Sequence, residues 1–288
     1  MTRGSQIVTR AAHAKINVFL RVAGLRPDGY HEIASLVVPI SLADTVTVSA
    51  ADSLEVEVTG DPSRVADVPV GGLNLAIVAA LALGASSGGR GAHIAIDKRI
   101  PSAAGLGGGS ADAAATLHAL NDLWGCGLEP EDLAGIAERV GSDVPALVLG
   151  GPVLVGGRGE ELRRAEVAGL SWVLVHGDRG VASPDAYRWW DEDGGVAGPD
   201  PSAVLAAARA GDPAALAPLL FNDLEGPVVA RRPEIGAARD HLLAAGALAA
   251  IMSGSGSSVV GLARDAAHAA AIAAGIPGAE PVTSVASA

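Results

Sequence analysis

The chain has 288 residues, of which 49% are hydrophobic and 18% charged, and its formal net charge at pH 7 is −12. This composition predicts a globular protein long enough for two domains of ordinary size. The acidic balance argues against nucleic acid or an anionic membrane as the main partner, because both require clustered Lys and Arg. The single Cys126 excludes a disulfide framework and a cysteine-rich zinc site, and the seven His residues show no paired ligand spacing, so we expect no intrinsic metal site.

The sequence shows no signal for export or for membrane insertion. Its first residues lack the long apolar segment of a secretory signal, and no uninterrupted apolar stretch reaches the roughly 18 residues that a membrane span needs. We therefore expect a cytoplasmic protein.

The first hundred residues are predicted to be rich in strands. β-branched residues and turn residues between them indicate short strands at 7–9, 14–22, 45–50, 54–59 and 93–96. A helix is predicted over 73–84, with Asn74 near its start.

A glycine-rich stretch at 101–116 comes directly before a predicted helix. Its glycines are Gly105, Gly107, Gly108 and Gly109, and they let the backbone take a positive φ and approach a ligand closely. Ser110 and Asp112 suit the cap and first turn of the helix. Its apolar residues, Ala113, Leu117, Leu120 and Trp124, recur at helical spacing up to the predicted C-cap Gly125. A helix N-terminus that follows a glycine turn favours the binding of an anion, and phosphate is the anion that we expect here.

The glycines alone leave two interpretations open, because a flexible turn or close helix packing gives the same composition as a phosphate loop. Two common nucleotide motifs are excluded. A P-loop requires a Lys after its second glycine, which is missing here, and the dinucleotide fingerprint requires a third glycine where this chain has Ser110.

The middle of the chain is predicted to alternate helix, turn and strand. A helix is expected over 130–140, a tight turn over 141–145, and strands over 146–149 and 153–155. Residues 158–168 are predicted to form a linker.

The last third is predicted to mix short helices with strands. A strand is expected at 172–176, followed by helices at 203–208 and 214–219, the first with Asp200 as N-cap and Pro201 as first helical residue. Residues 251–262 form a second glycine turn that leads into a strand.

Four separated motifs together resemble the GHMP small-molecule kinases. They lie at 14–17 (AKIN), 101–114, 141–145 (GSDVP) and 252–256 (MSGSG), in the order that the family has. The resemblance implies an α+β fold of two domains. These are an N-terminal nucleotide-binding domain of the ribosomal protein S5 type at 1–160 and a C-terminal α/β-sandwich domain at 161–288, with the active site in the cleft between them.

Residues 26–32 (RPDGYHE) narrow the resemblance to members whose substrate carries a cytidine diphosphate. Those members use ATP and Mg²⁺ to phosphorylate the C2 hydroxyl of 4-diphosphocytidyl-2-C-methyl-D-erythritol, in the non-mevalonate route to isoprenoids. The implied partner is a small molecule, and the oligomeric state is left open.

The resemblance implies that Asp143 is the catalytic base and Lys15 its electrostatic partner. Phosphoryl transfer needs a group that accepts the proton of the attacking hydroxyl, and a nearby cation keeps such a carboxylate ionised. Lys15 and Lys98 are the only lysines of the chain. Arg is the usual basic residue of this sequence, so Lys15 is an exception. Without the resemblance, a strand-end lysine and a turn-forming Asp would be the favoured interpretation.

The resemblance also implies which residues bind the cytidylyl substrate. Tyr30 and Tyr187 would stack on the cytosine, and His31 would hydrogen-bond its polar edge. Asn17 and Ser183 lie where polar contacts to the substrate are expected. The alternative for Tyr187 is packing on the domain surface.

For ATP, the resemblance implies that the glycine-rich turn surrounds the phosphates and that Asn74 lies near the adenine. The predicted nucleotide-binding residues are Asn74, Pro101, Gly105, Leu106, Gly107, Gly108, Gly109 and Ser110. Family members often have a second Ser directly after the residue that matches Ser110. This chain has Ala111 there, so Ser110 alone supplies a hydroxyl group at these two positions. The 252–256 turn would close around the reacting groups, although a plain turn before a strand has the same spacing.

Two other interpretations remain. A homoserine, mevalonate or galactose kinase shares the four motifs, but its substrate carries no base to stack on the aromatic rings. A non-catalytic nucleotide-binding protein shares the fold, because fold does not fix function. The presence of both Lys15 and Asp143 argues against the second.

Overall fold

The structure is a computed structural model that describes residues 6–88, 90–177 and 179–286. The chain forms two compact units, each assembled from segments that are distant in the sequence. The first unit takes residues up to 14, 42–102 and 107–150, and the second takes 15–41, 103–106 and 151–288. Strands β1 (Ile7–Leu25) and β2 (His31–Ala50) each run from one unit into the other. The predicted domain boundary at 160/161 stays a prediction.

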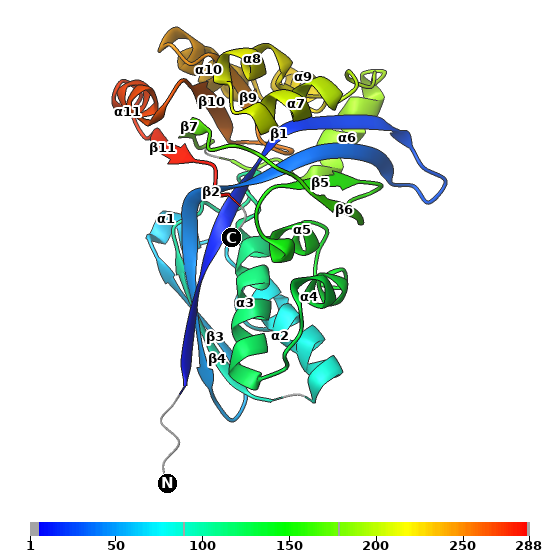
Figure 1. Cartoon of the computed structure of the whole chain (residues 1–288), viewed down its shortest axis with the longest axis vertical. Helices are drawn as coiled ribbons and strands as arrows, with labels where there is room; N and C mark the ends of the chain where they lie inside the picture. Colours follow the sequence, from blue (N-terminus) through cyan, green and yellow to red (C-terminus); the bar gives the residue numbers. More distant parts are fainter. Residues whose placement is uncertain (1–5, 89, 178, 287–288) are drawn as a thin grey trace. The chain divides into compact units, whose positions relative to one another are not determined.

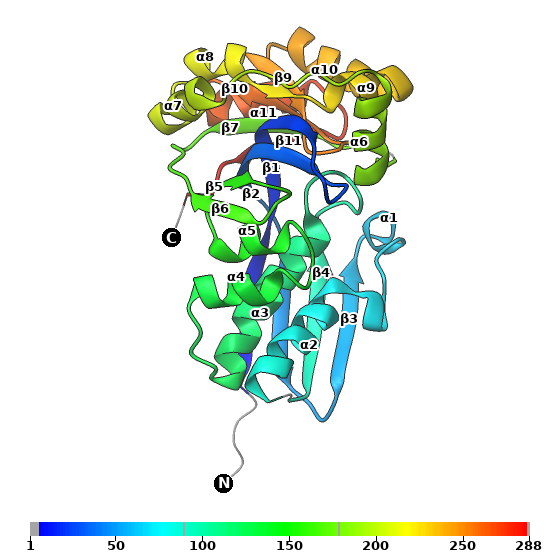
Figure 2. The same cartoon turned by 90° about the vertical axis from the view of Figure 1, so that its right-hand side faces the viewer.

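The first unit packs helices on a small sheet. β4 (Ala92–Lys98) pairs in parallel with β3 (Leu54–Gly60) and antiparallel with the end of β2. Figure 2 shows two long helices side by side over these strands, α2 (Leu75–Ser87) and α3 (Gly108–Trp124). The other helical segments of this unit are α1 (Pro62–Val65), the 3-10 turn η1 (Gly71–Leu73), α4 (Pro130–Ala137) and α5 (Val144–Leu149).

The second unit contains a four-stranded antiparallel sheet. Its order is β11 (Glu280–Thr283), β7 (Ser171–Val175), β10 (Val259–Ala263) and β9 (Ala249–Met252). In Figure 1, α10 (Pro233–Ala244) lies against β9 and β10, and α11 (Ala266–Ala274) lies against β7 and β11. The remaining elements are β5 (Val153–Gly156), β6 (Glu161–Arg164), α6 (Ser183–Glu192), α7 (Ser202–Ala210), α8 (Pro213–Leu216), the 3-10 turn η2 (Ala217–Leu219), β8 (Phe221–Asn222) and α9 (Glu225–Arg231).

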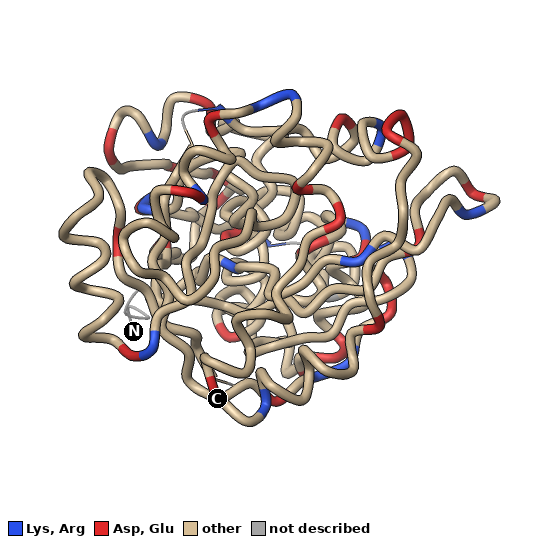
Figure 3. Tube along the Cα trace, turned by 90° about the horizontal axis from the view of Figure 1, so that it is seen from above, with Lys and Arg blue, Asp and Glu red and all other residues tan. Residues whose placement is uncertain are grey.

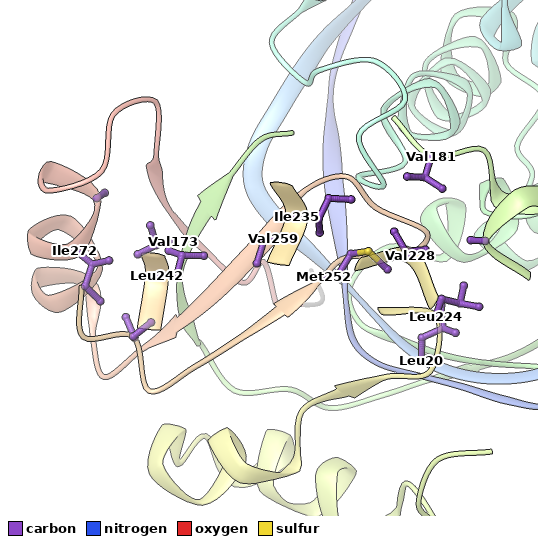
Figure 4. Close-up of a cluster of buried hydrophobic side chains, with 14 of the residues drawn as sticks. Leu20, Val173, Val181, Leu224, Val228, Ile235, Leu242, Met252, Val259 and Ile272 are labelled. Carbon is purple, nitrogen blue, oxygen red and sulfur yellow. The ribbon is translucent and has the colours of Figure 1, made fainter. Parts of the chain in front are cut away.

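A buried apolar cluster holds these elements of the second unit together. Figure 4 shows Val173, Leu242, Met252, Val259 and Ile272, which come from strands and helices far apart in the sequence. Each is at most 3% exposed. Burying one such side chain contributes roughly 1.5–3 kcal/mol, so this cluster fixes the sheet that carries the second glycine turn.

Charged residues of opposite sign are interspersed along the trace in Figure 3. Arg26, for example, lies 2.8 Å from Glu32 and 3.6 Å from Glu160. Such partly exposed pairs contribute little to stability. Among the described residues, no helix has both the length and the apolar composition that crossing a bilayer requires.

Three predicted elements are wrong. Residues 146–149 belong to the helix α5 rather than to a strand, because Pro145 starts a helical turn within a short apolar run. The predicted linker at 158–168 contains strand β6, which pairs with β5. Pro201 is the N-cap of α7 rather than its first helical residue, and Asp200 accepts a hydrogen bond from the backbone of Ser202.

Candidate active site

Lys15 lies at the start of a chain of buried polar contacts in the second unit. Its Nζ donates to Oδ1 of Asn17 at 2.8 Å, and Nδ2 of Asn17 donates to Oγ of Ser35 at 2.7 Å. The Ser35 hydroxyl in turn donates to the carbonyl of Phe19. Lys15 and Asn17 meet because residues i and i+2 of a strand share a face. The ammonium group is thus held in one place.

The glycine turn at 252–256 lies directly beside this lysine. Gly254 has φ +57°, and a Cβ there would lie 3.1 Å from Nζ of Lys15 and 3.4 Å from Oδ1 of Asn17. Ser253 Oγ donates to the carbonyl of Gly105 at 3.1 Å. The predicted Lys-Ile-Asn motif, the start of the first glycine stretch and the second glycine turn therefore meet in this unit.

The first glycine stretch supplies the N-terminus of α3 in the first unit. Gly107 is its N-cap, in the left-handed conformation (φ 67°, ψ 23°), and no side chain caps the helix. The first turn carries no acidic residue, which suits an anion at this end. Ser110 and Asp112 do not cap the helix, so that prediction is wrong, whereas Gly125 is its C-cap as predicted.

Gly107 tests whether this turn binds nucleotide. If the turn binds the phosphates, Gly107→Ala should raise the KM for ATP much more than the KM for the second substrate, because a left-handed Ala costs about 1–2 kcal/mol and displaces the backbone N–H groups of the turn. Gly125→Ala is the matched control, with φ 64° at the other end of the same helix. Steady-state kinetics that show equal KM changes for both substrates would make the turn structural.

Lys98, at the end of β4, is buried between two carboxylates in the first unit. Its Nζ donates to Oδ2 of Asp44 and, at 2.7 Å, to Oδ2 of Asp112. Asp44 Oδ1 also accepts from the backbone of Ile100, which fixes the chain before the glycine stretch. Burial raises the pKa of Asp112 to about 7, against the lowering effect of the Lys98 ammonium. Oδ1 of Asp112 has no hydrogen-bond partner.

Asp143 is the N-cap residue of α5 in the first unit and is exposed. Its side chain makes no capping hydrogen bond to the helix. The resemblance assigns this carboxylate the role of catalytic base. That role stays a prediction.

Two of the three predicted cytosine residues, His31 and Tyr187, form an aromatic group with Trp190 in the second unit. The ring of His31 stacks on Tyr187, with centroids 4.9 Å apart, and meets Trp190 edge-on at 5.8 Å. Nε2 of His31 lies 3.0 Å from a carboxylate oxygen of Asp191. One face of Tyr187 is thus covered by His31, and Tyr187 also packs against the buried apolar cluster of this unit.

Tyr30 and Ser183 make other contacts in the same unit. Tyr30 is 56% exposed, and the guanidinium of Arg158 lies 5.1 Å from the centroid of its ring. Ser183, the first residue of α6, hydrogen-bonds through Oγ to Oγ of Ser255 at 3.2 Å. Ser183 is thereby connected to the glycine turn beside Lys15.

The side chain of Asn74 makes two hydrogen bonds at the start of α2. Its Oδ1 accepts from the backbone of Ala76 and its Nδ2 donates to the carbonyl of Pro69. The predicted N-terminal position is confirmed, while the role toward adenine stays a prediction. In the described ranges, no group of three or more His, Cys, Asp or Glu side chains is arranged to hold a metal ion.

Two segments of the sequence match known family models. Residues 74–151 match the GHMP kinases N terminal domain, and residues 204–280 match the GHMP kinases C terminal family. Two relatives carry the name 4-diphosphocytidyl-2-C-methyl-D-erythritol kinase. That of Gloeobacter violaceus is 43% identical over 93% of this chain and 89% of its own length. That of Symbiobacterium thermophilum is 44% identical over 88% of this chain and 89% of its own length.

The chain belongs to the 4-diphosphocytidyl-2-C-methyl-D-erythritol kinase family of the GHMP kinases. A crystal structure of 4-(cytidine 5'-diphospho)-2C-methyl-D-erythritol kinase matches 96% of this chain and 98% of its own, with a TM-score of 0.81 and 35% identity. Homoserine kinase from Cytophaga hutchinsonii matches with a TM-score of 0.71 at 19% identity, which shows the shared fold alone. The predicted GHMP kinase fold is confirmed.

Proposed function

We propose that this member of the family transfers the γ-phosphate of ATP to the C2 hydroxyl of 4-diphosphocytidyl-2-C-methyl-D-erythritol, giving the 2-phosphate and ADP in the non-mevalonate route to isoprenoids. The observation that carries the proposal is 43% identity over nearly the whole chain with a kinase named for this substrate. The polar and aromatic groups around Lys15 and His31 support it.

The proposed chemistry divides among three groups of residues. Asp143 accepts the proton of the C2 hydroxyl, and Lys15, held by Asn17, is its electrostatic partner. The N-terminus of α3, from Gly107 to Ser110, holds the phosphates through backbone N–H groups and the helix dipole. Positioning and charge stabilisation of this kind supply most of the catalysis in phosphoryl transfer.

Mg²⁺ is proposed to enter as its complex with ATP. This ion takes oxygen ligands and is often held by one or two carboxylates together with the phosphates of the substrate. In the first unit, the hydroxyl of Ser110, in the first turn of α3, has the chemistry to hold it. The bound ion would neutralise the charge that develops on the phosphates.

Removing one aromatic ring should weaken substrate binding. Tyr187→Ala and Tyr30→Ala should each cost roughly 1–3 kcal/mol of substrate binding free energy, the range for a base stacked on an aromatic side chain. Trp189→Ala is the control, since Trp189 lies on the same helix α6 but contacts Arg188 and Arg231 instead. Titration calorimetry in which Tyr187→Ala binds as tightly as Trp189→Ala would assign Tyr187 to the scaffold.

The function is tested by measuring ADP release with a panel of acceptors. The panel contains the cytidylyl substrate, homoserine, mevalonate and galactose, each with ATP and Mg²⁺. We expect turnover of the cytidylyl substrate alone. Faster turnover of another acceptor would assign the chain to a different GHMP activity, and no turnover of any would favour a non-catalytic protein.

A further inference from the structure

Asn222 is a buried amide that no motif in the sequence singled out. It ends β8, which pairs in parallel with β1 so that Asn222 lies opposite Leu20. Its Nδ2 donates to two carbonyls of the second glycine turn, those of Met252 and Gly254, each at 2.8 Å. Its Oδ1 accepts from the backbone of Leu224 at 3.0 Å. Both N–H groups of the amide therefore donate hydrogen bonds to the turn.

The turn that Asn222 holds is the one that lies beside Lys15. Gly254 has its Cα close enough to Lys15 that an added Cβ would lie 3.1 Å from Nζ. Glu225 gives a second anchor to the same turn, since its Oε2 accepts from the backbone of Met252 at 2.7 Å. The other oxygen of Glu225 pairs with Arg239, which keeps that carboxylate in place.

We propose that Asn222 is a positioning residue, which fixes the 252–256 turn against Lys15 and thereby sets the place of the Lys15 ammonium during phosphoryl transfer. The inference rests on the proposed function, in which Lys15 takes part in the reaction. Without the amide, two buried carbonyl groups of one turn lose their donor, and each such loss is costly. Gly254 has no side chain to hold the turn, so the backbone beside Nζ moves instead.

The test is Asn222→Asp, which keeps the shape of the side chain and removes both N–H donors. Its carboxylate faces two carbonyl oxygens, which raise the pKa of this group and repel its ionised form. We expect kcat to fall by about 10- to 100-fold at pH 8, the scale of a small misplacement in a catalytic site. As pH falls, the protonated carboxyl can donate to one carbonyl, so the ratio of variant to parent kcat should rise.

Asn121→Asp is the matched control. Asn121 closes another loop in the same way, with Nδ2 donating to the carbonyl of Leu128 and Oδ1 accepting from its backbone N–H, each at 3.0 Å. This change should lower thermal stability and leave the kcat of the folded protein unchanged. Asn222→Ser gives a second test variant, because its hydroxyl donates one hydrogen and does not ionise. Its kcat should be reduced by the same fraction at every pH.

The outcomes separate this inference from the proposed function. If the parent protein does not phosphorylate the cytidylyl substrate, the proposed function fails before any variant is compared. If the parent is active and Asn222→Asp keeps its kcat at pH 8, or loses it only in proportion to its unfolded fraction, Asn222 is merely structural. A loss of kcat that recovers toward low pH in Asn222→Asp but not in Asn222→Ser supports the positioning role.

Discussion

Asp143→Asn should lower kcat by about 10²- to 10⁴-fold, the usual contribution of a positioned general base. The substitution keeps the size of the side chain and removes its basicity. Since Asp143 is exposed, thermal stability and ATP binding should stay close to those of the parent. Asp132→Asn is the control, because Asp132 belongs to the capping box of α4 and its loss should affect stability but not kcat.

Lys15→Met should impair the same step as Asp143→Asn. If the two residues act as a unit, the double variant will be far less impaired than the product of the two single losses. Single-turnover measurements give this comparison without interference from product release. Strictly multiplicative losses, or a near-parent kcat for Asp143→Asn, would contradict the assignment of this pair.

Lys98→Met should lower the free energy of unfolding by about 3–5 kcal/mol, the cost of leaving a buried ion pair without one partner. Asp44 and Asp112 would then face each other in the core without the ammonium, both at most 4% exposed on their side chains. Replacing one carboxylate as well, in Lys98→Met/Asp112→Asn, should recover part of this loss. Urea unfolding followed by circular dichroism measures all three proteins.

The loss of unfolding free energy in Lys98→Met should depend on pH in a defined direction. The pKa of Asp112 is about 7 in the folded protein, above its ordinary value of 3.8, so the folded state binds more protons than the unfolded state between these values. The contribution of Asp112 to stability is therefore greatest below pH 4 and decreases as pH rises toward 7. Without Lys98 this pKa rises further, so the variant should lose most at pH 8 and less at pH 6. A loss of unfolding free energy below about 1 kcal/mol at both pH values would be typical of an exposed ion pair and would contradict this account.

Local patterns predicted those elements whose ends are marked by specific residues. α3 ends at its C-cap Gly125, and Asn74 lies at the start of α2, as the positions of these residues indicated. β2 was predicted only from residue 45, because residues 36–40 are buried on both faces and give no alternation. Pro39 also argues against a strand at that point.

The site was predicted only where a motif supplied the residue. Lys15, Asn17 and His31 lie in motifs, whereas Ser35 and Asn222 act through partners distant in the sequence. Asn222 binds carbonyls 30 and 32 residues further along the chain, and no spacing rule relates them. Asp191 lies 160 residues from His31, so only the fold brings these two side chains together.

The central claim is tested most directly by phosphorus NMR of the reaction products. The protein is incubated with ATP, Mg²⁺ and 4-diphosphocytidyl-2-C-methyl-D-erythritol, and the spectrum is followed over time. The account predicts a new phosphate monoester resonance on the methylerythritol, with the cytidine diphosphate intact and ADP formed in equal amount. An unchanged substrate spectrum, while homoserine or mevalonate is phosphorylated under the same conditions, would contradict it.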